Sequence, residues 1–521
     1  MPLAVIFSRG LSGLDAPQVR VEVHLTNGLP AFTIVGLADT GVRESKDRVR
    51  AAIIQSGYEF PNRRITVNLA PADLPKYSGR FDLAIALGIL AASAKLPCNQ
   101  LDQYEFAGEL SLSGELRPFS GCLAIAMAMR KEKSLRSFII PQENCSVTSI
   151  IPDLRVLGAN CLAQVCDFLC GRIQLQVVGK NAKKQAIELK EVSTHDIAHI
   201  QGQLLAKRGL EIAAAGFHSL LLAGPPGCGK SMLAKCLPQL LPKLTLDEAL
   251  EVAALHSLKG ARHHRALEPT ALSRLRPWQH PHHSITTAAL VGGGAPPLPG
   301  AITLAHQGVL FLDELPQFAR QTLEALREPL QNRVVTITRA HFASHFPCNF
   351  MLVAAMNLCP CGYFGHPEKV CICSATQRLR YQNKISGPLL DRIDIKMMIA
   401  PVPHELFFQT QLTATASANS NQVATRIANA WALQINRQGK LNHALDDQEI
   451  KNWVAIDAAD EHDLHAVWKG LNLSGRGVHR LLKIARTIAD LEGTTSTQVK
   501  RAHLLEASAL SKPINGMMNS F

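Results

Sequence analysis

One glycine-rich segment constrains the fold of this 521-residue chain more than any other stretch. It follows the apolar run 220–223, precedes a segment with helical periodicity, and reads Gly224-Pro225-Pro226-Gly227-Cys228-Gly229-Lys230-Ser231. Between a strand and a helix, such glycines let backbone N–H groups surround phosphates, and the helix N-terminus adds partial positive charge. A lysine here reaches the outer phosphates of a nucleotide, and the following hydroxyl holds Mg²⁺. We therefore predict that Lys230 and Ser231 bind a nucleoside triphosphate and magnesium. The alternative is a glycine-rich turn between a strand and a helix.

An acidic pair supplies the second half of such a site. The buried-strand pattern 308–312 ends in Asp313 and Glu314. Hydrolysis needs a second magnesium ligand and a base that polarises water, and Asp313 and Glu314 provide them in that order. A further apolar run, 350–355, is followed by Asn357, whose amide can orient the attacking water. The alternatives are a solvated acidic turn and a simple turn asparagine. Both are disfavoured by the glycine-rich segment 224–231 upstream, which we call the phosphate loop.

The charge of the whole chain indicates an anionic partner. The net charge is +12 and the sequence pI is about 9.1, which favours nucleic acid first and a membrane surface second. Aromatic residues make up only 5% of the chain, so a surface built mainly on base stacking is not expected. The 13 scattered cysteines, without a signal sequence, predict a reducing, cytoplasmic compartment. No apolar run reaches the ~18 residues of a membrane helix, so no membrane partner is expected.

Changes in pattern divide the chain. Residues 1–170 alternate short apolar runs with helical periodicity, as is typical of an α/β domain. Residues 171–194 are rich in lysine and glutamine and are interpreted as a linker. The nucleotide domain is predicted over 195–402, and 403–521 comprises a polar linker and a helical domain.

Four cysteines in two close pairs form a separate signal inside the nucleotide domain. They are Cys359, Cys361, Cys371 and Cys373. Such pairs of thiolates can enclose zinc tetrahedrally, although C-x-C is less usual than C-x₂-C. We interpret 359–373 as a zinc-ribbon-like insert with a structural metal, with His366 as an alternative ligand. Four reduced cysteines in a loop are the alternative without metal.

Further motifs carry a resemblance to a known family. Ile200-Gln201-Gly202-Gln203, 310–315 and 386–394 resemble the magnesium-chelatase-like branch of the AAA+ ATPases. Pro281-His282-His283-Ser284, 326–330 and 478–486 are similar to segments of the ComM/YifB family within that branch. The resemblance covers nearly the whole chain. It implies an α/β fold with an N-terminal Lon-protease-like domain, an AAA+ phosphate-loop core with a parallel sheet, and a C-terminal helical lid domain.

The resemblance also implies roles for single residues. Asn357 corresponds to the first sensor, Arg392 to the arginine finger that reaches a neighbouring subunit's nucleotide, and Arg476 to the second sensor, with Arg480 as the less favoured choice. Guanidinium groups neutralise charge on the transferred phosphoryl group. A finger that acts on a neighbour requires an oligomer, so the resemblance implies a ring, expected to be a hexamer. Without the family pattern, each arginine would be interpreted as part of a surface salt bridge.

A basic, histidine-rich segment lies between the two halves of the nucleotide site. It contains Arg262-His263-His264-Arg265, Arg274, Arg276, His282 and His283. Such a loop suits contact with a phosphate backbone, and in helicase relatives inserts in this region point into the central pore of the ring. We predict DNA or pore contact for Arg274, Arg276, His282 and His283. The alternatives are a metal site at the adjacent histidines and hydrogen bonding to the segment's own backbone.

The Lon-like resemblance raises the question of proteolysis. Ser78 lies near the position of the Lon nucleophile, but its surroundings, 76–82, lack the Gly-Pro-Ser-Ala-Gly context, and no paired lysine is identifiable. Without an activated nucleophile there is no covalent catalysis. We therefore interpret 1–170 as a protease fold without an intact Ser-Lys dyad, which serves as a scaffold or DNA-binding collar.

The sequence thus predicts a ring-forming AAA+ ATPase that uses ATP hydrolysis to translocate on single-stranded and branched DNA. The ComM-like pattern implies a branch-migration helicase that promotes homologous recombination during natural transformation. The main alternative is a chelatase-type ATPase subunit that drives metal insertion into a tetrapyrrole. An ATP-dependent protease and a nucleotide-regulated DNA-binding protein without motor activity are the others.

Overall fold

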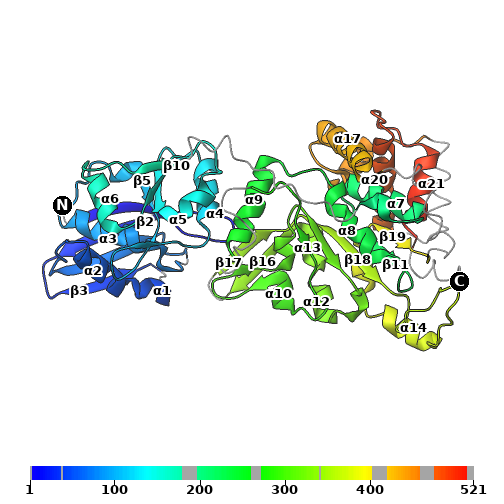
Figure 1. The fold of residues 1–521 in the computed structure, drawn as a ribbon, viewed down its shortest axis with the longest axis horizontal. Coiled ribbons are helices and arrows are strands. Elements are labelled where there is room, and N and C mark those ends of the chain that lie inside the picture. The colour runs from blue at the N-terminus through cyan, green and yellow to red at the C-terminus, as the bar shows by residue number, and fades with distance from the viewer. Residues whose placement is uncertain are drawn as a thin grey trace.

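The computed structural model describes residues 3–36, 39–74, 76–178, 196–259, 272–339, 342–401, 419–457 and 474–512. The predicted linker 171–194 lies outside the described residues from position 179 onward, and Arg262–Arg265 lies outside them entirely. Figure 1 shows an elongated molecule with the N-terminal unit at one end and the C-terminal helices at the other. Among the described segments, no helix combines the length and the apolar character needed to cross a membrane.

A mixed sheet organises the N-terminal unit. Its strands are β1 (Leu3–Arg9), β2 (Gln18–Thr26), β3 (Ala31–Val35), β4 (Arg64–Ala70), β5 (Tyr104–Phe106), β8 (Ser137–Pro141), β9 (Val156–Ala159) and β10 (Gln176–Val178). Their order is β10-β9-β8-β5-β1-β2-β4-β3, with β1 antiparallel to β2 and parallel to β5. Burial alternates along β2, so one face of this strand meets the core and the other does not. A short hairpin, β6 (Glu109–Leu110) and β7 (Leu116–Arg117), lies apart from the sheet.

Helices cover this sheet. They are α1 (Thr40–Arg43), α2 (Ser45–Gln55), α3 (Asp82–Ala92), α4 (Cys122–Lys131), α5 (Gln142–Thr148) and α6 (Leu162–Leu169). Every residue of α3 is buried, because the helix is apolar on nearly all sides and lies between the sheet and α2. The N-terminal unit therefore has its own hydrophobic core.

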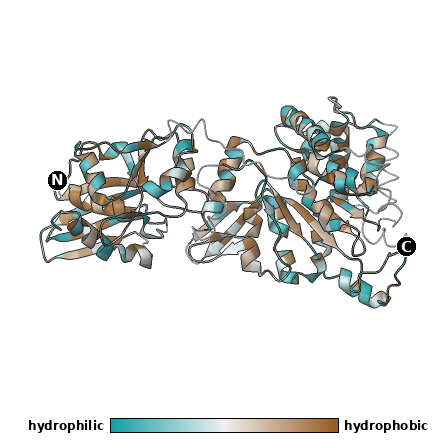
Figure 2. Ribbon diagram, in the orientation of Figure 1, coloured by the Kyte–Doolittle hydropathy of each residue, from teal (hydrophilic) through white to brown (hydrophobic). Residues whose placement is uncertain are grey.

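A second, fully parallel sheet organises the centre of the chain. Its strands are β11 (Leu220–Ala223), β12 (Trp278–Gln279), β15 (Val309–Leu312), β18 (Met351–Met356) and β19 (Ile395–Met398). Their order is β12-β15-β18-β11-β19, and every neighbouring pair is parallel. Strands with both faces covered are continuous apolar runs, and Figure 2 shows the strands of this sheet in brown inside more hydrophilic helices.

The elements around this sheet are mostly short. They are α7 (Leu204–Gly216), α8 (Lys230–Leu240), α9 (Leu246–Ser257), α10 (Thr287–Val291), α11 (Ala301–Leu304), α12 (Arg320–Glu324), α13 (Arg327–Asn332), α14 (Ala375–Gln382) and α15 (Gly387–Leu390), with the hairpins β13 (Gly292–Gly293)/β14 (Leu298–Pro299) and β16 (Val334–Arg339)/β17 (Phe342–Pro347). Helix α9 packs on α4, and Arg130 Nη1 lies 2.9 Å from Asp247 Oδ1. These contacts join the two units (Figure 1).

The C-terminal region is helical. It comprises α17 (Ser420–Gln438), α18 (Asp447–Trp453), α20 (Gly475–Leu491) and α21 (Arg501–Leu510). Its apolar residues share one core with α7, α8 and the parallel sheet. Trp431 Nε1 and Gln434 Nε2 donate to the carbonyls of Ala214 and Ala215 at 3.0 and 2.9 Å. The predicted α/β fold with a parallel sheet and a helical C-terminal region is confirmed.

A polar network joins the helical region to the sheet. His218 Nε2 lies 2.9 Å from Thr487 Oγ1 of α20, and His218 Nδ1 lies 3.6 Å from Asp394 Oδ2. Ser219 Oγ also lies 3.1 Å from the same carboxylate oxygen. Burial opposes the charged form, but the hydrogen bond and charge of His218 hold the pKa of Asp394 well below its usual range. The Asp394 carboxylate therefore favours the folded state most when it is ionised.

Candidate nucleotide site

Neighbouring strands bring the predicted nucleotide residues to one edge of the parallel sheet. β18 lies between β11 and β15. The phosphate loop follows β11, Asp313 and Glu314 follow β15, and Asn357 follows β18. Because the strands are parallel, their carboxyl ends meet at the same edge, which is where open α/β sheets bind ligands.

Lys230 lies in a cradle formed by the phosphate loop. Its Nζ donates to the carbonyls of Gly224 and Pro225 at 2.8 and 2.7 Å and to Oδ1 of Asn357 at 3.1 Å. The loop turns at Gly227, whose φ of 79° is one that glycine adopts without steric cost. Burial lowers the pKa of Lys230. One desolvated cation therefore links the loop to the end of β18.

Ser231 and Asp313 meet directly. Ser231 Oγ donates to Asp313 Oδ2 at 2.7 Å, and Asp313 Oδ1 accepts the N–H of Glu314 at 2.9 Å. A hydroxyl from the first turn of α8 and a carboxylate that follows β15 are the kind of oxygen ligands that Mg²⁺ prefers. Glu314 has a φ of 52°, which is uncommon for a residue with a Cβ, and its side chain is 55% exposed. Such backbone outliers cluster at active sites, and the carboxylate is accessible to a ligand.

The histidine-rich segment lies against this acidic pair, an arrangement that the sequence analysis did not anticipate. His283 Nδ1 lies 3.6 Å from Glu314 Oε2. The ring of His280 lies 4.8 Å from that of Phe311 in β15, and burial lowers the pKa of His280. The cause is β12, which pairs in parallel with β15, so that residues after β12 reach the same sheet edge. A strand of two residues carries too little pattern for recognition in the sequence.

The structure contradicts the predicted DNA contact of Arg276. Its side chain is only 2% exposed. Nε donates to the carbonyl of Pro242 at 2.7 Å, Nη1 donates to the carbonyl of Gln307 at 2.8 Å, and the guanidinium lies over the ring of Trp431. These contacts hold the segment before β12 to its neighbours. The prediction was wrong because basic composition does not show which cations the fold buries.

Arginines gather on another face of the nucleotide unit. Arg392 donates to the carbonyl of Pro388 and to Oε1 of Gln331, both at 2.7 Å. Burial and the nearby charges of Arg327 and Arg476 lower the pKa of Arg392. Arg476 is exposed in the first turn of α20. In the described part of the chain, the hydrogen bonds and ion pairs of these residues do not reach the phosphate loop or the acidic pair.

Arg480, the less favoured candidate for the second sensor, contacts groups outside the nucleotide site. Its Nη1 donates to the carbonyl of Ile393 at 2.9 Å, and its Nη2 lies 3.6 Å from Asp391 Oδ1. Arg480 therefore holds α20 to the segment that carries Arg392. This contact favours Arg476 over Arg480 as the arginine available to a nucleotide.

The predicted zinc cysteines converge. All four Sγ atoms lie within 4.8 Å of one another. Cys361 lies 3.3 Å from Cys359 and 3.6 Å from Cys371. Four thiolates at the usual zinc–sulfur distance of ~2.3 Å lie about 3.8 Å apart in a tetrahedron, so the donor set fits zinc. His366 Nδ1 instead accepts the N–H groups of Glu368 and Lys369 at 3.1 Å, and the cluster consists of cysteines alone.

The cysteine segment packs on the nucleotide site. Gly362 has a φ of 87°, and a Cβ placed there would lie 3.1 Å from Cδ of Pro226 and 3.8 Å from Nδ2 of Asn357. Tyr381 of α14 is buried, and burial together with the charge of Glu314 raises the pKa of Tyr381 to about 12. The segment from the first cysteine to α14 therefore contacts both the phosphate loop and the surroundings of the acidic pair.

Ser78 in the N-terminal unit has no lysine among its hydrogen-bond partners in the described residues. Its Oγ accepts a hydrogen bond from Arg80 Nε at 3.0 Å, whereas buried Lys76 donates to the carbonyl of Pro71. A serine with this partner lacks the neutral amine that activates a Ser-Lys dyad. The geometry gives no support to proteolysis.

Comparisons with known proteins bear on the whole chain. The family models "Magnesium chelatase, subunit ChlI", "Subunit ChlI of Mg-chelatase" and "Magnesium chelatase, subunit ChlI C-terminal" match residues 196–406, 21–144 and 417–510. The chain is 45% identical over 508 residues to "Uncharacterized protein YifB" of Escherichia coli, covering 97% of this chain and 96% of that protein. It is 43% identical over 510 residues to "Competence protein ComM" of Haemophilus influenzae, covering 97% of each.

Proposed function

Because this chain belongs to the ComM/YifB family of magnesium-chelatase-like ATPases, we propose that it is a ring-forming AAA+ ATPase that translocates on DNA. In its specific form, the proposal is a branch-migration helicase that promotes homologous recombination, and so integration of DNA, during natural transformation. The family supports ATP hydrolysis with magnesium. Action on DNA is supported by the net charge of +12 and by the relative named for competence.

The observation that carries the proposal is the convergence at the edge of the parallel sheet. Lys230 contacts Asn357, and Ser231 contacts Asp313, so three strands contribute to one site. Each of these groups has a place in the hydrolysis of a nucleoside triphosphate. A simple βα turn would not require these contacts between separate strands.

In the proposed reaction, Lys230 and the N–H groups of the phosphate loop bind the phosphates of ATP. Ser231 and Asp313 hold magnesium, which neutralises charge on the phosphates when bound. Glu314 polarises the attacking water, and Asn357 helps to orient it. His283, 3.6 Å from Glu314, positions that carboxylate.

Arg392 and Arg476 act on the nucleotide of a neighbouring subunit in this proposal. Their positive charges lie close enough for repulsion to lower the pKa of Arg392, and their contacts lie apart from the chain's own phosphate loop. Two guanidinium groups without an ion pair in the described residues suit the phosphates of an adjacent site, and a trans-acting arginine contributes roughly 10³–10⁵ in rate. The assembly is then a ring, and we propose a hexamer.

Two further parts of the proposal concern metal and DNA. The four converging cysteines hold a structural zinc without a role in the chemistry. Arg274 and His282 are exposed and, with His283, supply DNA or pore contacts. The proposed location is the cytoplasm, in keeping with 13 cysteines that are all free thiols.

The test is strand exchange on a labelled synthetic Holliday junction with ATP. The intact chain is compared with Glu314→Gln and with Glu143→Gln, which makes the same change at an exposed residue of α5. We expect product from the intact chain and from Glu143→Gln, and none from Glu314→Gln. If the intact chain hydrolyses ATP but moves no junction, the helicase proposal fails.

The matching family models favour one second candidate, a chelatase-type ATPase subunit that drives metal insertion into a tetrapyrrole. Such a subunit requires a partner that carries the tetrapyrrole, and DNA would not change its ATP turnover. ATP hydrolysis by the purified chain with and without branched DNA separates the two. Stimulation by DNA supports the motor, and an unchanged rate supports the chelatase-type subunit.

A further inference from the structure

A basic groove lies between α12 and α14, beside the nucleotide site. Its volume is about 770 Å³. Its cations are Arg320 from α12 and, from the opposite wall, Arg380 and Lys384, and no acidic residue lines it. Phe318 and Leu379 supply its apolar surface. Figure 1 shows α14 at the lower right, away from the C-terminal helices.

One face of α14 and its C-terminal extension forms a wall of the groove. The lining residues are Thr376, Leu379, Arg380, Asn383 and Lys384, at positions i, i+3, i+4, i+7 and i+8. Residues at this spacing share one helix face, with a rise of ~5.4 Å per turn. All five are exposed. The wall therefore presents a row of hydrogen-bond donors and two cations along one line.

In the described part of the chain, the cations of this groove are not held in ion pairs, although side-chain hydrogen bonds, and with them the charge of Arg320, lower the pKa of Glu324. Within the described residues, no ion pair joins Arg320, Arg380 or Lys384 to an acid. Glu324 lies one turn along α12 from Arg320, but Arg327 Nη1 binds its carboxylate at 2.8 Å. When several positive charges are gathered in a groove, the groove focuses their electric field and attracts anions.

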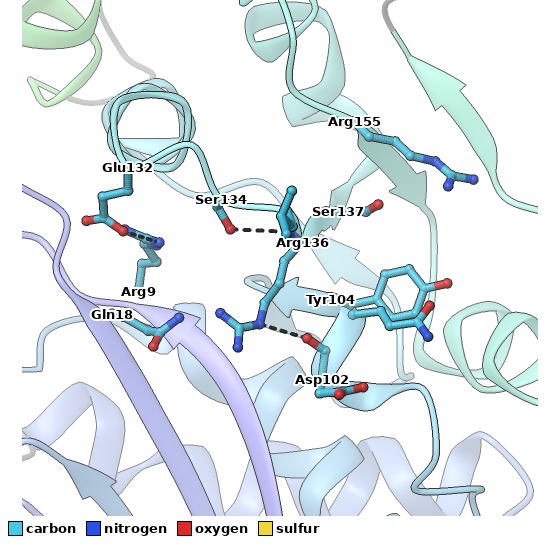
Figure 3. A pocket seen from close by; sticks show the side chains of 11 residues that line it. Arg9, Gln18, Asp102, Tyr104, Glu132, Ser134, Arg136, Ser137 and Arg155 are labelled. Atoms are coloured by element: carbon cyan, nitrogen blue, oxygen red, sulfur yellow. Dashed lines mark hydrogen bonds and ion pairs between the residues drawn. The ribbon is translucent and has the colours of Figure 1, made fainter.

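A second hollow, in the N-terminal unit, provides a contrast. It has a volume of about 720 Å³ and also contains arginines (Figure 3). Here Arg9 lies 2.6 Å from buried Glu105 and 2.7 Å from Glu132, and Arg136 Nε donates to the carbonyl of Asp102 at 2.7 Å. The protein's own groups therefore neutralise Arg9 and hold Arg136, whereas exposed Arg155 also lines this hollow. Among the residues that the structure describes, the cations of the α12–α14 groove form no ion pairs of this kind.

We propose that the α12–α14 groove binds the phosphate backbone of a nucleic acid strand. The inference rests on the proposed function, because it names the surface through which the motor holds DNA. Arginine, lysine, threonine and asparagine are the side chains that contact backbone phosphates, and Arg320, Arg380 and Lys384 supply the charge. The only aromatic residue in the lining, Phe318, is 3% exposed, so the groove offers no platform for base stacking. Recognition is therefore independent of base sequence.

Both walls of the groove continue into the nucleotide site. On one side, the N–H of Gln317 donates to the carbonyl of Glu314 at 2.7 Å. On the other, the inner face of α14 carries buried Tyr381, and Gln382 Nε2 donates to the carbonyl of Leu358, next to Asn357, at 2.9 Å. A strand in the groove contacts the two segments that hold the proposed base and first sensor. DNA bound there raises ATP turnover through these segments.

The experiment compares the full chain with Arg380→Ala/Lys384→Ala. A matched control, Lys131→Ala/Lys451→Ala, removes two exposed cations at α4 and α18. Fluorescence anisotropy of a labelled single strand between ~50 and ~200 mM salt gives the slope of log affinity against log salt. Each lost phosphate contact reduces this slope by ~0.7, so the groove variant loses about 1.4 and the control keeps the slope of the intact chain.

A second readout is the ratio of ATP turnover with and without DNA, which we expect to fall several-fold in the groove variant. Arg320→Ala changes the opposite wall alone and is expected to reduce the salt slope by ~0.7. This single variant keeps the inference testable if the double variant does not fold.

The outcomes separate the inference from the proposed function. If the intact chain does not bind DNA at any salt concentration, the proposed function fails and the inference fails with it. If the intact chain binds with a steep salt slope that Arg380→Ala/Lys384→Ala and Arg320→Ala share, only the inference is overturned. If the salt slope is unchanged in the variants but the protein concentration needed for ring assembly shifts, the groove is an interface between copies of the chain. That result would also overturn the inference.

Discussion

Replacement of Gly362 by alanine tests whether the cysteine segment supports the phosphate loop. An added Cβ would lie 3.1 Å from Cδ and 3.3 Å from Cγ of Pro226. Non-bonded carbons prefer ~3.5–4.0 Å, so the Pro226 ring must move by a few tenths of an ångström. Gly439→Ala is the matched control, because Gly439 has a φ of 72° but no atom lies within 4 Å of an added Cβ.

Both variants lose stability through backbone strain, but only Gly362→Ala is expected to disturb the phosphate loop. A residue with a Cβ loses ~1–2 kcal/mol in the left-handed region, and this loss applies to Gly362 at a φ of 87° as it does to Gly439. Only the change at Gly362 displaces Pro226. A displacement of ~1 Å at a catalytic site costs on the order of 10² in rate, or about 2.7 kcal/mol. A shift of ~0.3–0.5 Å then costs about 1 kcal/mol, which is roughly 5-fold in kcat/KM.

The assay measures the thermal unfolding midpoint and kcat/KM for ATP in both variants. We expect both midpoints to fall by similar amounts, because the backbone cost is the same. We expect kcat/KM to fall roughly 5-fold for Gly362→Ala and to stay at the value of the intact chain for Gly439→Ala. Equal kcat/KM values in the two variants would refute the coupling between the cysteine segment and the phosphate loop.

Three further predictions follow from the same geometry. Arg392→Ala lowers ATP turnover by at least ~10³. Mixing it with Lys230→Ala restores part of the activity, because one variant supplies an intact Lys230 and the other an intact Arg392 at a site shared by two subunits. The absence of any recovery would contradict action in trans. Cys361→Ser reduces bound zinc, measured by elemental analysis, from about one per chain towards none, whereas Cys98→Ser, outside the cluster, leaves it unchanged. The pKa of Asp394 is lower in the folded chain than its unfolded value of ~3.9, so its stabilisation is complete above that value and is lost as the pH falls through the folded pKa. Asp394→Asn therefore lowers the thermal unfolding midpoint at pH 7, and this loss becomes smaller as the pH falls below ~3.9. A loss of the same size at every pH would exclude this linkage.

Several features were predictable because they depend on residues close together in the chain. The phosphate loop is defined by glycines, a lysine and a hydroxyl within eight positions, and its strand and helix flank it directly. The apolar runs of β15 and β18 predicted buried parallel strands. Since parallel strands end at one edge, the meeting of Asp313 and Asn357 near Lys230 followed from the order of motifs. Family membership was also predictable, because each motif that carries the resemblance is a short run of consecutive residues, and the comparisons confirm it.

Other features depend on contacts between distant segments. Arg276 and Arg274 have the same basic character in the sequence, yet only Arg276 is buried, because the carbonyls of Pro242 and Gln307 surround its guanidinium. His283 meets Glu314 only because the two residues of β12 pair with β15.

The α12–α14 groove brings Arg320 into one lining with Arg380 and Lys384, some sixty positions further along the chain. Local pattern thus determined which elements form and which chemistry the phosphate loop can perform. Tertiary structure decided which cations are neutralised, since burial and pairing depend on neighbours that the order of residues does not reveal.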